Sequence, residues 1–142
     1  MKKAFTLVEI LVVVTIIALL ASIAAVSYSQ FVKQSRDTRR KTDIEQIRGA
    51  VELYRNFDVN GEYPPSITFG TGDIADGSAT YLNKVPNDPL NARGNTYYYF
   101  REPSNKDYTL CVYLEGGGTS VVGTLCGTAL QCNYCMGPYG QK

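Results

Sequence analysis

The first 26 residues set the strongest limit on what this chain can fold into. Phe5–Val26 is a run of 22 residues in which only Thr6, Glu9, Thr15 and Ser22 are not apolar. As an α-helix this run would be about 33 Å long, enough to cross a bilayer core of about 30 Å. The remaining 116 residues carry 24 of the 27 charges. One end of the chain therefore suits lipid and the other suits water, which argues against a freely soluble monomer.

Composition excludes several classes of function. The formal net charge of +1 gives no general case for nucleic-acid binding, which favours clearly basic domains. The part outside the apolar run is too short for a Rossmann or barrel enzyme. The chain has no histidine, which removes Ser-His-Asp and Cys-His catalysis, and no phosphate-binding glycine loop stands out. We therefore expect a structural protein with no cofactor rather than an enzyme.

Glu9 distinguishes the apolar run from a plain membrane anchor. A carboxylate one turn into a spanning helix costs roughly 2.5–3.5 kcal/mol on insertion scales. A positive amino group one turn away would offset that cost, and it would exist in the membrane if the chain were cut before Phe5. Such a cut removes Lys2 and Lys3, whose charges otherwise stay cytoplasmic. A cleaved secretory signal peptide, with Ala21–Ala25 as its cleavage site, is the alternative.

The amino terminus then resembles a known family. Lys2-Lys3-Ala4, followed by Phe5-Thr6-Leu7-Val8-Glu9 and the apolar run, is similar to the prepilin signature of bacterial type IV pilins and type II secretion pseudopilins. The resemblance implies cleavage between Ala4 and Phe5 by a prepilin peptidase, which also methylates the amino group of Phe5. It also implies that Glu9 neutralises the amino terminus of an adjacent subunit during assembly. The chain departs from the family at Ala4, where glycine is usual, and at Ala25-Val26, where many members have proline.

The resemblance also implies partners and a location. The subunit would wait in the bacterial inner membrane as a single-pass precursor and then enter a homo-oligomeric filament. A cytoplasmic assembly ATPase and an inner-membrane platform would drive this step. The filament would be an extracellular pilus or a periplasmic pseudopilus, and DNA is a further candidate partner. The domains implied are a leader over residues 1–4, a transmembrane and assembly helix over 5–26, an amphipathic helix over 27–60 and a β domain over 61–142.

Helical signals continue beyond the apolar run. Ile44, Ile47, Val51 and Tyr54 recur at helical spacing, and together with Ala50, Leu53 and Phe57 they predict one buried face. We expect one helix over residues 5–56 that ends near residues 58–60, with Gly61 as the stop. Seven of the 14 basic residues lie between Lys33 and Arg55. A solvated helix face explains them best, and contact with anionic lipid or DNA is the alternative.

The second half predicts a loop-rich antiparallel β domain. Residues 66–95 are rich in turn signals, and residues 96–101 and 108–115 suit two strands joined through Pro103-Ser104-Asn105. A third strand is expected over residues 119–125. The sheet would present one face to the amphipathic helix, giving an α+β fold. Three aspartates of the loop region could supply calcium ligands, but turn chemistry is the better interpretation of Asp73, Asp76 and Asp88.

Four cysteines lie in the last 32 residues, at Cys111, Cys126, Cys132 and Cys135. In an exported domain an even number predicts two disulfides. A hairpin centred between Gly118 and Thr119 would place Cys111 opposite Cys126 and leave Cys132 with Cys135, and we slightly favour this pairing over Cys111–Cys135 with Cys126–Cys132. The alternatives are a four-thiolate zinc site and a redox centre at Cys132-Asn133-Tyr134-Cys135.

The sequence leaves three functions open within this frame. The leading one is a subunit of a type IV pilus-like filament that serves adhesion, motility or DNA uptake. A major pseudopilin is the second, because Val85-Pro86-Asn87-Asp88-Pro89 also looks like that group. The third is a minor tip subunit that binds DNA or a surface, for which Arg93 and Arg101 are the candidate contacts.

Overall fold

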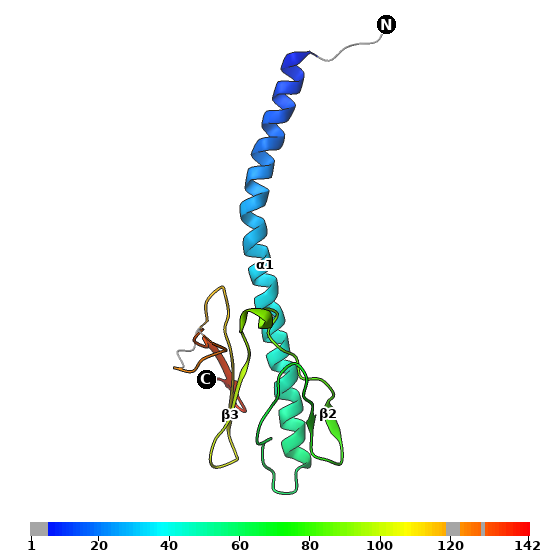
Figure 1. The fold of residues 1–142 in the computed structure, drawn as a ribbon, viewed down its shortest axis with the longest axis vertical. Helices are drawn as coiled ribbons and strands as arrows, with labels where there is room; N and C mark the ends of the chain where they lie inside the picture. Colours follow the sequence, from blue (N-terminus) through cyan, green and yellow to red (C-terminus); the bar gives the residue numbers. More distant parts are fainter. Residues whose placement is uncertain (1–5, 119–122, 129) are drawn as a thin grey trace. The chain divides into compact units, whose positions relative to one another are not determined.

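The computed structural model describes residues 6–118, 123–128 and 130–142, with the backbone alone at residues 25 and 26 (Figure 1). The chain divides into two compact units, Met1–Ser35 and Arg36–Lys142. The helix α1 (Leu7–Phe57) begins in the first unit and ends in the second. All the strands that the structure describes lie in the second unit. The predicted α+β class, a long amino-terminal helix with small antiparallel sheets, is confirmed.

Helix α1 ends where the sequence predicts. Its last residue is Phe57, and the Asp58 N–H still donates to the Tyr54 carbonyl at 2.9 Å. The Asp58 carboxylate then accepts the N–H groups of Asn60 (2.9 Å) and Glu62 (3.0 Å), which turns the chain. Gly61 has a φ of 64°, a left-handed conformation that glycine adopts without steric cost.

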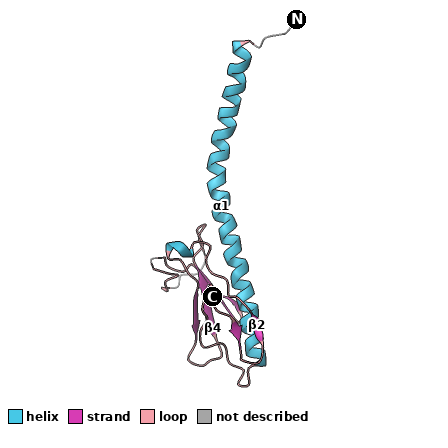
Figure 2. Ribbon diagram, turned by 45° about the vertical axis from the view of Figure 1, so that its right-hand side comes forward, coloured by secondary structure: helices cyan, strands magenta, loops and turns pink. Residues whose placement is uncertain are grey.

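Two antiparallel sheets accompany the second half of α1 (Figure 2). A two-stranded sheet pairs β1 (Ile74–Ala75) with β2 (Thr80–Leu82). The larger sheet has the order β3-β4-β5-β6, and each pair in it is antiparallel. Its strands are β3 (Tyr98–Arg101), β4 (Tyr108–Val112), β5 (Tyr134–Gly137) and β6 (Gly140–Gln141). A short 3-10 helix, η1 (Asn91–Arg93), precedes β3.

One hydrophobic core joins α1 to both sheets. From α1 it takes Ile44, Ile47 and Val51, which are fully buried, together with Ala50. The alternation predicted along β4 is also confirmed. Tyr108, Leu110 and Val112 of this strand are buried, and so is Leu114, the next residue of the alternating series. The helical and strand periods of the sequence therefore converge on the same core, as an α+β layer requires.

The predicted buried face of α1 is too wide. Leu53 is 46% exposed and Phe57 is 68% exposed, although both were expected beside Tyr54 in the core. The Phe57 ring stacks on Tyr81 with ring centroids 5.9 Å apart, so it covers the edge of β2 without being enclosed. The sheets are too small at this end of the helix to cover two further positions.

The two strands expected over residues 96–101 and 108–115 are present as β3 and β4, paired from Tyr98↔Cys111 to Arg101↔Tyr108. The prediction missed β5 and β6. The third strand, expected over residues 119–125, lies partly outside the described residues; of its remainder, Leu125 forms an isolated bridge with Gln131. The strand that pairs with β4 on the side away from β3 is instead β5, which is short and lies next to a Gly-Pro turn.

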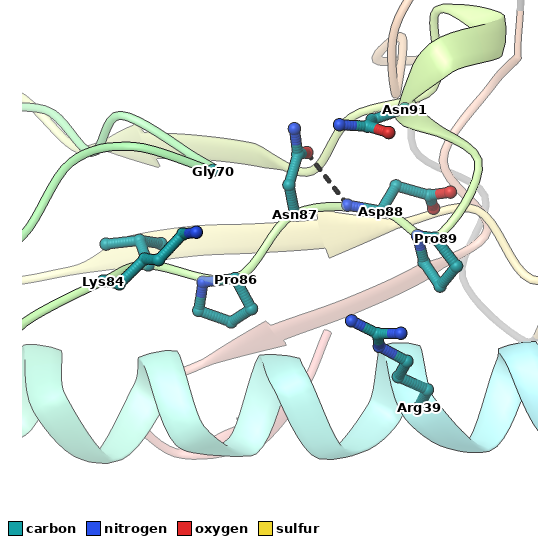
Figure 3. Close-up of a pocket in the computed structure, with 9 residues that line it drawn as sticks. Arg39, Gly70, Lys84, Pro86, Asn87, Asp88, Pro89 and Asn91 are labelled. Carbon is teal, nitrogen blue, oxygen red and sulfur yellow. Dashed lines mark hydrogen bonds between the residues drawn. The ribbon is translucent and has the colours of Figure 1, made fainter.

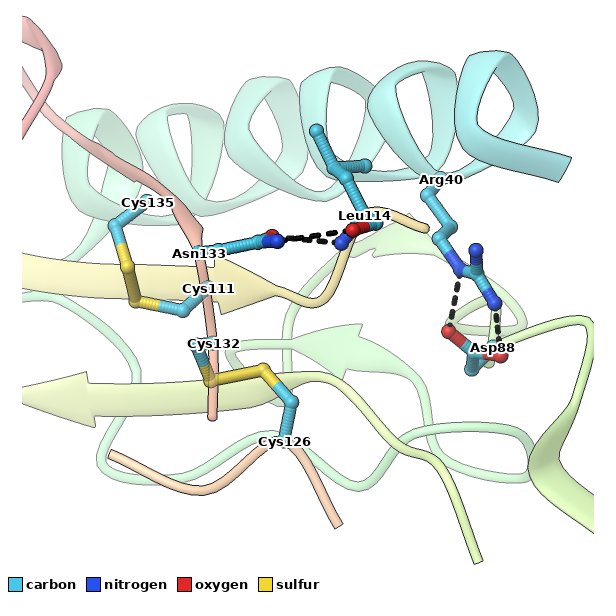
Figure 4. Close-up of a disulfide and its surroundings, with 8 residues drawn as sticks. All are labelled: Arg40, Asp88, Cys111, Leu114, Cys126, Cys132, Asn133 and Cys135. Carbon is cyan, nitrogen blue, oxygen red and sulfur yellow. Dashed lines mark hydrogen bonds and ion pairs between the residues drawn. A yellow bond between two sulfur atoms is a disulfide. The ribbon is translucent and has the colours of Figure 1, made fainter. Parts of the chain in front are cut away.

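The two disulfides join Cys111 to Cys135 and Cys126 to Cys132 (Figure 4). The pairing that we slightly favoured is therefore wrong, and its alternative is correct. Cys111 and Cys135 lie directly opposite each other on β4 and β5, with Cα atoms 4.1 Å apart. Cys126 and Cys132 flank the Leu125↔Gln131 bridge, which closes a much smaller loop.

Asn133 explains why β4 pairs with β5 and not with residues nearer in the sequence. Its side-chain amide accepts the Leu114 N–H at 2.7 Å and donates to the Leu114 carbonyl at 2.9 Å. Its own N–H donates to the Val112 carbonyl at 3.1 Å. The asparagine thus continues the β4–β5 pairing by one side chain beyond the last strand residue.

The disulfides also cover the face of the sheet that α1 does not. All four cysteines are buried in a second cluster, against which Tyr98 and Tyr113 pack. The middle of the larger sheet, at β4 and β5, is therefore buried on both sides, by the helix on one and by the disulfides on the other. Cross-linking replaces a second hydrophobic layer that a domain of this size cannot supply.

A buried arginine of α1 holds the loops in place. Arg40 is fully buried and grips the Asp88 carboxylate with two hydrogen bonds, Nε to Oδ2 at 2.7 Å and Nη2 to Oδ1 at 3.1 Å (Figure 4). Its Nη1 donates to Asp37 at 2.7 Å and to Glu115 at 2.9 Å. One guanidinium thus joins the helix, the loop before η1 and the segment after β4.

Neighbouring groups complete this ion-pair cluster, which consists of Arg36, Asp37, Arg40, Asp88 and Glu115. Arg36 Nε donates to Glu115 Oε1 at 2.6 Å. The Asp37 carboxylate also accepts the backbone N–H groups of Glu115 (3.0 Å) and Gly116 (2.8 Å). The guanidinium groups of Arg36 and Arg40 lower the pKa of Glu115 to about 2, with Arg36 making the larger contribution.

We predict that Arg40→Met destabilises the second unit by about 3–5 kcal/mol, because it leaves Asp88 buried without its cation. Arg39→Met is the matched control, since Arg39 is exposed and its pair with Asp43 is worth at most about 1 kcal/mol. Urea unfolding of the full chain in detergent, followed by tyrosine near-UV circular dichroism, measures both. Equal loss in the two variants would show that the cluster does not hold the fold.

The cluster also predicts how stability depends on pH. Because the folded-state pKa of Glu115 lies below its unfolded value, its contribution is present at neutral pH and is lost as pH falls from about 5 to about 2. The full contribution is on the order of 3 kcal/mol. Glu115→Gln should therefore be less stable than the wild type at pH 7 and approach it at pH 2. A stability difference that stays constant over this range would contradict the assignment.

Candidate assembly site in the amino-terminal segment

The apolar side chains of the first half of α1 are exposed. An 18-residue window of this helix has a mean hydropathy of 2.8, and none of it is buried within the chain. The exposed fractions of its large apolar residues run from 48% to 80%, for Leu7, Val8, Ile10, Leu11, Val12, Val13, Val14, Ile16, Ile17, Leu19, Leu20 and Ile23. The segment is long and apolar enough to cross a membrane, a property that it shares with signal sequences. It is unlike the core helix of a soluble domain, which would be buried.

Glu9 closes the amino-terminal end of α1. The N–H and the hydroxyl of Thr6 donate to Glu9 Oε2 at 2.8 and 2.9 Å, and the Glu9 N–H donates back to Thr6 Oγ1 at 3.3 Å. This reciprocal arrangement is a capping box, which satisfies backbone donors that the first turn of a helix leaves open. We had not predicted it, although the Thr-x-x-Glu spacing ahead of an apolar run is its sequence signal.

Other polar groups of the segment are satisfied within the helix. The Thr15 hydroxyl donates to the Val12 carbonyl at 2.8 Å, and the Ser22 hydroxyl donates to the Leu19 carbonyl at 2.7 Å. These two residues can therefore enter an apolar environment without unpaired donors. Glu9 is the one formal charge between Thr6 and Ile23. It is the residue of this segment that needs a charged partner.

The expected cleavage site lies outside the described residues. Ala4 and Phe5, where we expect cutting and N-methylation, directly precede Thr6. In the cut chain the α-amino group of Phe5 would be one residue from the Thr6 N–H that already bonds Glu9. The capped turn thus holds the carboxylate at the end of the helix where that amino group would appear.

Two of the three aspartates that we considered as calcium ligands, Asp76 and Asp88, have other partners. Asp76 accepts the N–H groups of Ser78 and Ala79 and the hydroxyl of Tyr81, which builds the β1–β2 turn. Asp88 is taken by Arg40. Within residues 6–118, 123–128 and 130–142, no group of three or more acidic or cysteine side chains is placed to hold a metal ion.

Neither alternative for the cysteines, the redox centre or the zinc site, fits the disulfides of the structure. A redox centre at Cys132 and Cys135 would need those two residues to form one disulfide, but each is bonded to a different cysteine. A zinc site would need free thiolates, and the cysteines that the structure describes are all oxidised.

Arg93 and Arg101, the candidate DNA or surface contacts, are not equivalent. Arg101 donates to the Tyr63 carbonyl at 3.0 Å and lies 3.5 Å from Glu62, so it is engaged within the domain. Arg93 is exposed on η1. Of the basic run between Lys33 and Arg55, Arg40 is buried, which corrects the view of this run as a solvated face throughout.

Comparison with known proteins finds a methylation motif and partial similarity to fimbrial proteins. The family described as the prokaryotic N-terminal methylation motif matches residues 1–25. A probable minor fimbrial protein of Dichelobacter nodosus is 48% identical over 58 residues, which cover 39% of this chain and 36% of that protein. The type IV major fimbrial protein FimA of the same organism is 38% identical over 52 residues, 37% of this chain and 33% of FimA.

The similarity is partial in extent. The chain spans about a third of the length of these curated relatives, and no solved structure matches it significantly. The match to the methylation motif covers the segment in which Glu9 caps an exposed apolar helix. The chain therefore carries the prokaryotic N-terminal methylation motif over residues 1–25, and the relatives that it matches are described as fimbrial proteins.

Proposed function

We propose that this chain is the structural subunit of a type IV pilus-like filament, cut between Ala4 and Phe5 and assembled through the helix that begins there. The exposed apolar segment headed by Glu9 carries the proposal, because its large apolar side chains are exposed in the part of the chain that the structure describes. Lipid would cover it in the inner membrane before assembly. The corresponding helices of other copies would cover it afterwards.

Glu9 gives this assembly its polarity. In the membrane the α-ammonium of the same chain, created by the cut, is near enough to offset its charge. In the filament the ammonium of an adjacent subunit takes this role, so that each joint between subunits contains one carboxylate and one amine. Such a head-to-tail contact is heterologous, and it gives an open helical polymer when the rotation between subunits does not close a ring.

The remaining partners follow from the same route. A prepilin peptidase would cut and methylate the precursor, and a cytoplasmic ATPase with an inner-membrane platform would supply the work of extraction. The domain from Arg36 onward would face an oxidising compartment, which its two disulfides suit. The fimbrial relatives favour a pilus over a secretion pseudopilus.

A minor subunit is the second candidate function. The relative with 48% identity is itself described as a probable minor fimbrial protein. A minor subunit would be present at low copy number relative to another pilin in purified filaments. Quantitative proteomics of sheared filaments separates the two functions, because a major subunit would dominate them.

We predict that the mature protein in filaments begins at Phe5 and carries one added methyl group at its amino terminus. Intact-mass spectrometry of filaments sheared from cells measures this directly. The membrane fraction of a peptidase-deficient strain is the control and should retain the Met1 start. Filaments composed of chains with an intact Met1 would refute the proposed processing.

We further predict that Glu9→Gln and Glu9→Ala leave the protein in the membrane but lower filament yield more than tenfold, because an ammonium loses its partner away from water. Glu9→Gln keeps an oxygen that can accept the capping hydrogen bonds, and Thr6→Ala removes the capping hydroxyl but keeps the charge. Immunoblots of sheared and membrane fractions measure the yield.

These variants separate the two roles of Glu9. If the charge drives assembly, Thr6→Ala assembles close to the wild-type level and Glu9→Gln does not. A normal yield from Glu9→Gln would mean that capping alone explains Glu9, and the proposed charge pairing would be wrong.

A further inference from the structure

A polar pocket of about 450 Å³ lies between α1 and the loop that leads from β2 to η1 (Figure 3). Arg39 contributes from α1, Lys84 and Asn87 contribute from the loop, and Asn91 contributes from the start of η1. In Figure 3 the Pro86 ring lies between the two basic side chains, and the Pro89 ring lies beside Arg39. The volume falls within the range of pockets that bind small molecules. None of the chemistry considered so far uses this pocket.

The two cations that line the pocket have little to neutralise them. Among the described residues, the Lys84 ammonium has no hydrogen-bond or ion-pair partner. Arg39 is exposed, and its Nε lies 4.0 Å from Asp43, whose carboxylate also accepts the Tyr97 hydroxyl. Both side chains therefore remain available to an anionic ligand.

The one carboxylate in the lining does not cancel this charge. Asp88 is bound by Arg40 through two hydrogen bonds and is 3% exposed. The ion pair of Asp88 with Arg40 is thus buried beneath the surface of the pocket. With Asp88 paired to Arg40, the cations left in the lining are Lys84 and Arg39, of which Arg39 has Asp43 at 4.0 Å.

Amide donors add to the two cations. Asn87 Oδ1 accepts the Asp88 N–H at 2.9 Å and the Thr96 hydroxyl at 3.3 Å, which fixes this oxygen and leaves the NH₂ group as a donor. Asn91 lies beside it at the start of η1, as Figure 3 shows. A guanidinium, an ammonium and amide N–H groups are the donors that bind phosphate oxygens.

We propose that this pocket binds a ligand with successive phosphate groups. Arg39 comes from α1 and Lys84 from the facing loop, so the lining offers two separate cations, and a chain of phosphates supplies an anionic group to each of them. Inorganic polyphosphate and the backbone of a single-stranded nucleic acid share this chemistry. All the residues that line the pocket belong to the second unit, Arg36–Lys142.

Calorimetric titration of the full chain in a zwitterionic detergent at low salt tests the proposal with two probes, tripolyphosphate and a short oligothymidylate. We expect saturable binding of at least one probe. Arg39→Gln combined with Lys84→Gln should weaken it at least about tenfold, because each change removes a charge-assisted hydrogen bond. Lys106→Gln, an exposed lysine in the β3–β4 turn outside the pocket, is the matched control and should change affinity less than twofold.

The outcomes are distinct. Binding of both probes with the same loss in the double variant identifies a phosphodiester chain as a ligand, and binding of tripolyphosphate alone identifies inorganic phosphate chains. The proposal is overturned if neither probe binds saturably, or if the double variant binds as tightly as Lys106→Gln. Since Arg39 and Lys84 are exposed, near-UV circular dichroism of the double variant should match the wild type.

Discussion

A fully buried guanidinium is stable only with carboxylates around it, and the second unit is arranged to supply them to Arg40. Asp37 comes from the helix itself, Asp88 from a loop and Glu115 from the segment after β4. The latter two lie 48 and 75 residues away in sequence, on segments without long strands or helices of their own. Because an unpaired charge here would cost several kcal/mol, the cluster fixes the path of loops that hydrophobic contacts alone would hold loosely.

The first unit presents the opposite situation. There the polar groups are satisfied within the helix, by the Thr6–Glu9 capping box and by the Thr15 and Ser22 hydroxyls, while the apolar side chains have no cover. The ion pairs of the second unit are completed within one chain, whereas the proposed function covers the exposed apolar side chains of the first unit with lipid or with other copies. That difference explains why one helix carries two compositions, and why Lys33–Arg55 holds half of the basic residues.

Much of this was predictable from local patterns, and the misses have physical causes. The helix, its end near Gly61 and the strands β3 and β4 depend on periodicity and turn chemistry, which short stretches of sequence contain. The disulfide pairing depends on which strand lies beside β4, and Asn133 decides that through side-chain hydrogen bonds to Leu114. The burial of Arg40 depends on residues far apart in sequence. No local pattern reports either contact, although Thr-x-x-Glu did signal the cap.

The cap changes how the role of Glu9 should be understood. If a neighbouring ammonium takes the Glu9 carboxylate during assembly, that carboxylate must keep or give up hydrogen bonds to Thr6. Only Oε2 accepts from Thr6, so Oε1 has capacity for an incoming amine while the cap persists. The helix end can therefore stay closed as its charge partner passes from its own chain to the next subunit. Because a carboxylate has two acceptor oxygens, this exchange needs no step in which the first turn frays. A side chain with a single acceptor at residue 9 would not allow it.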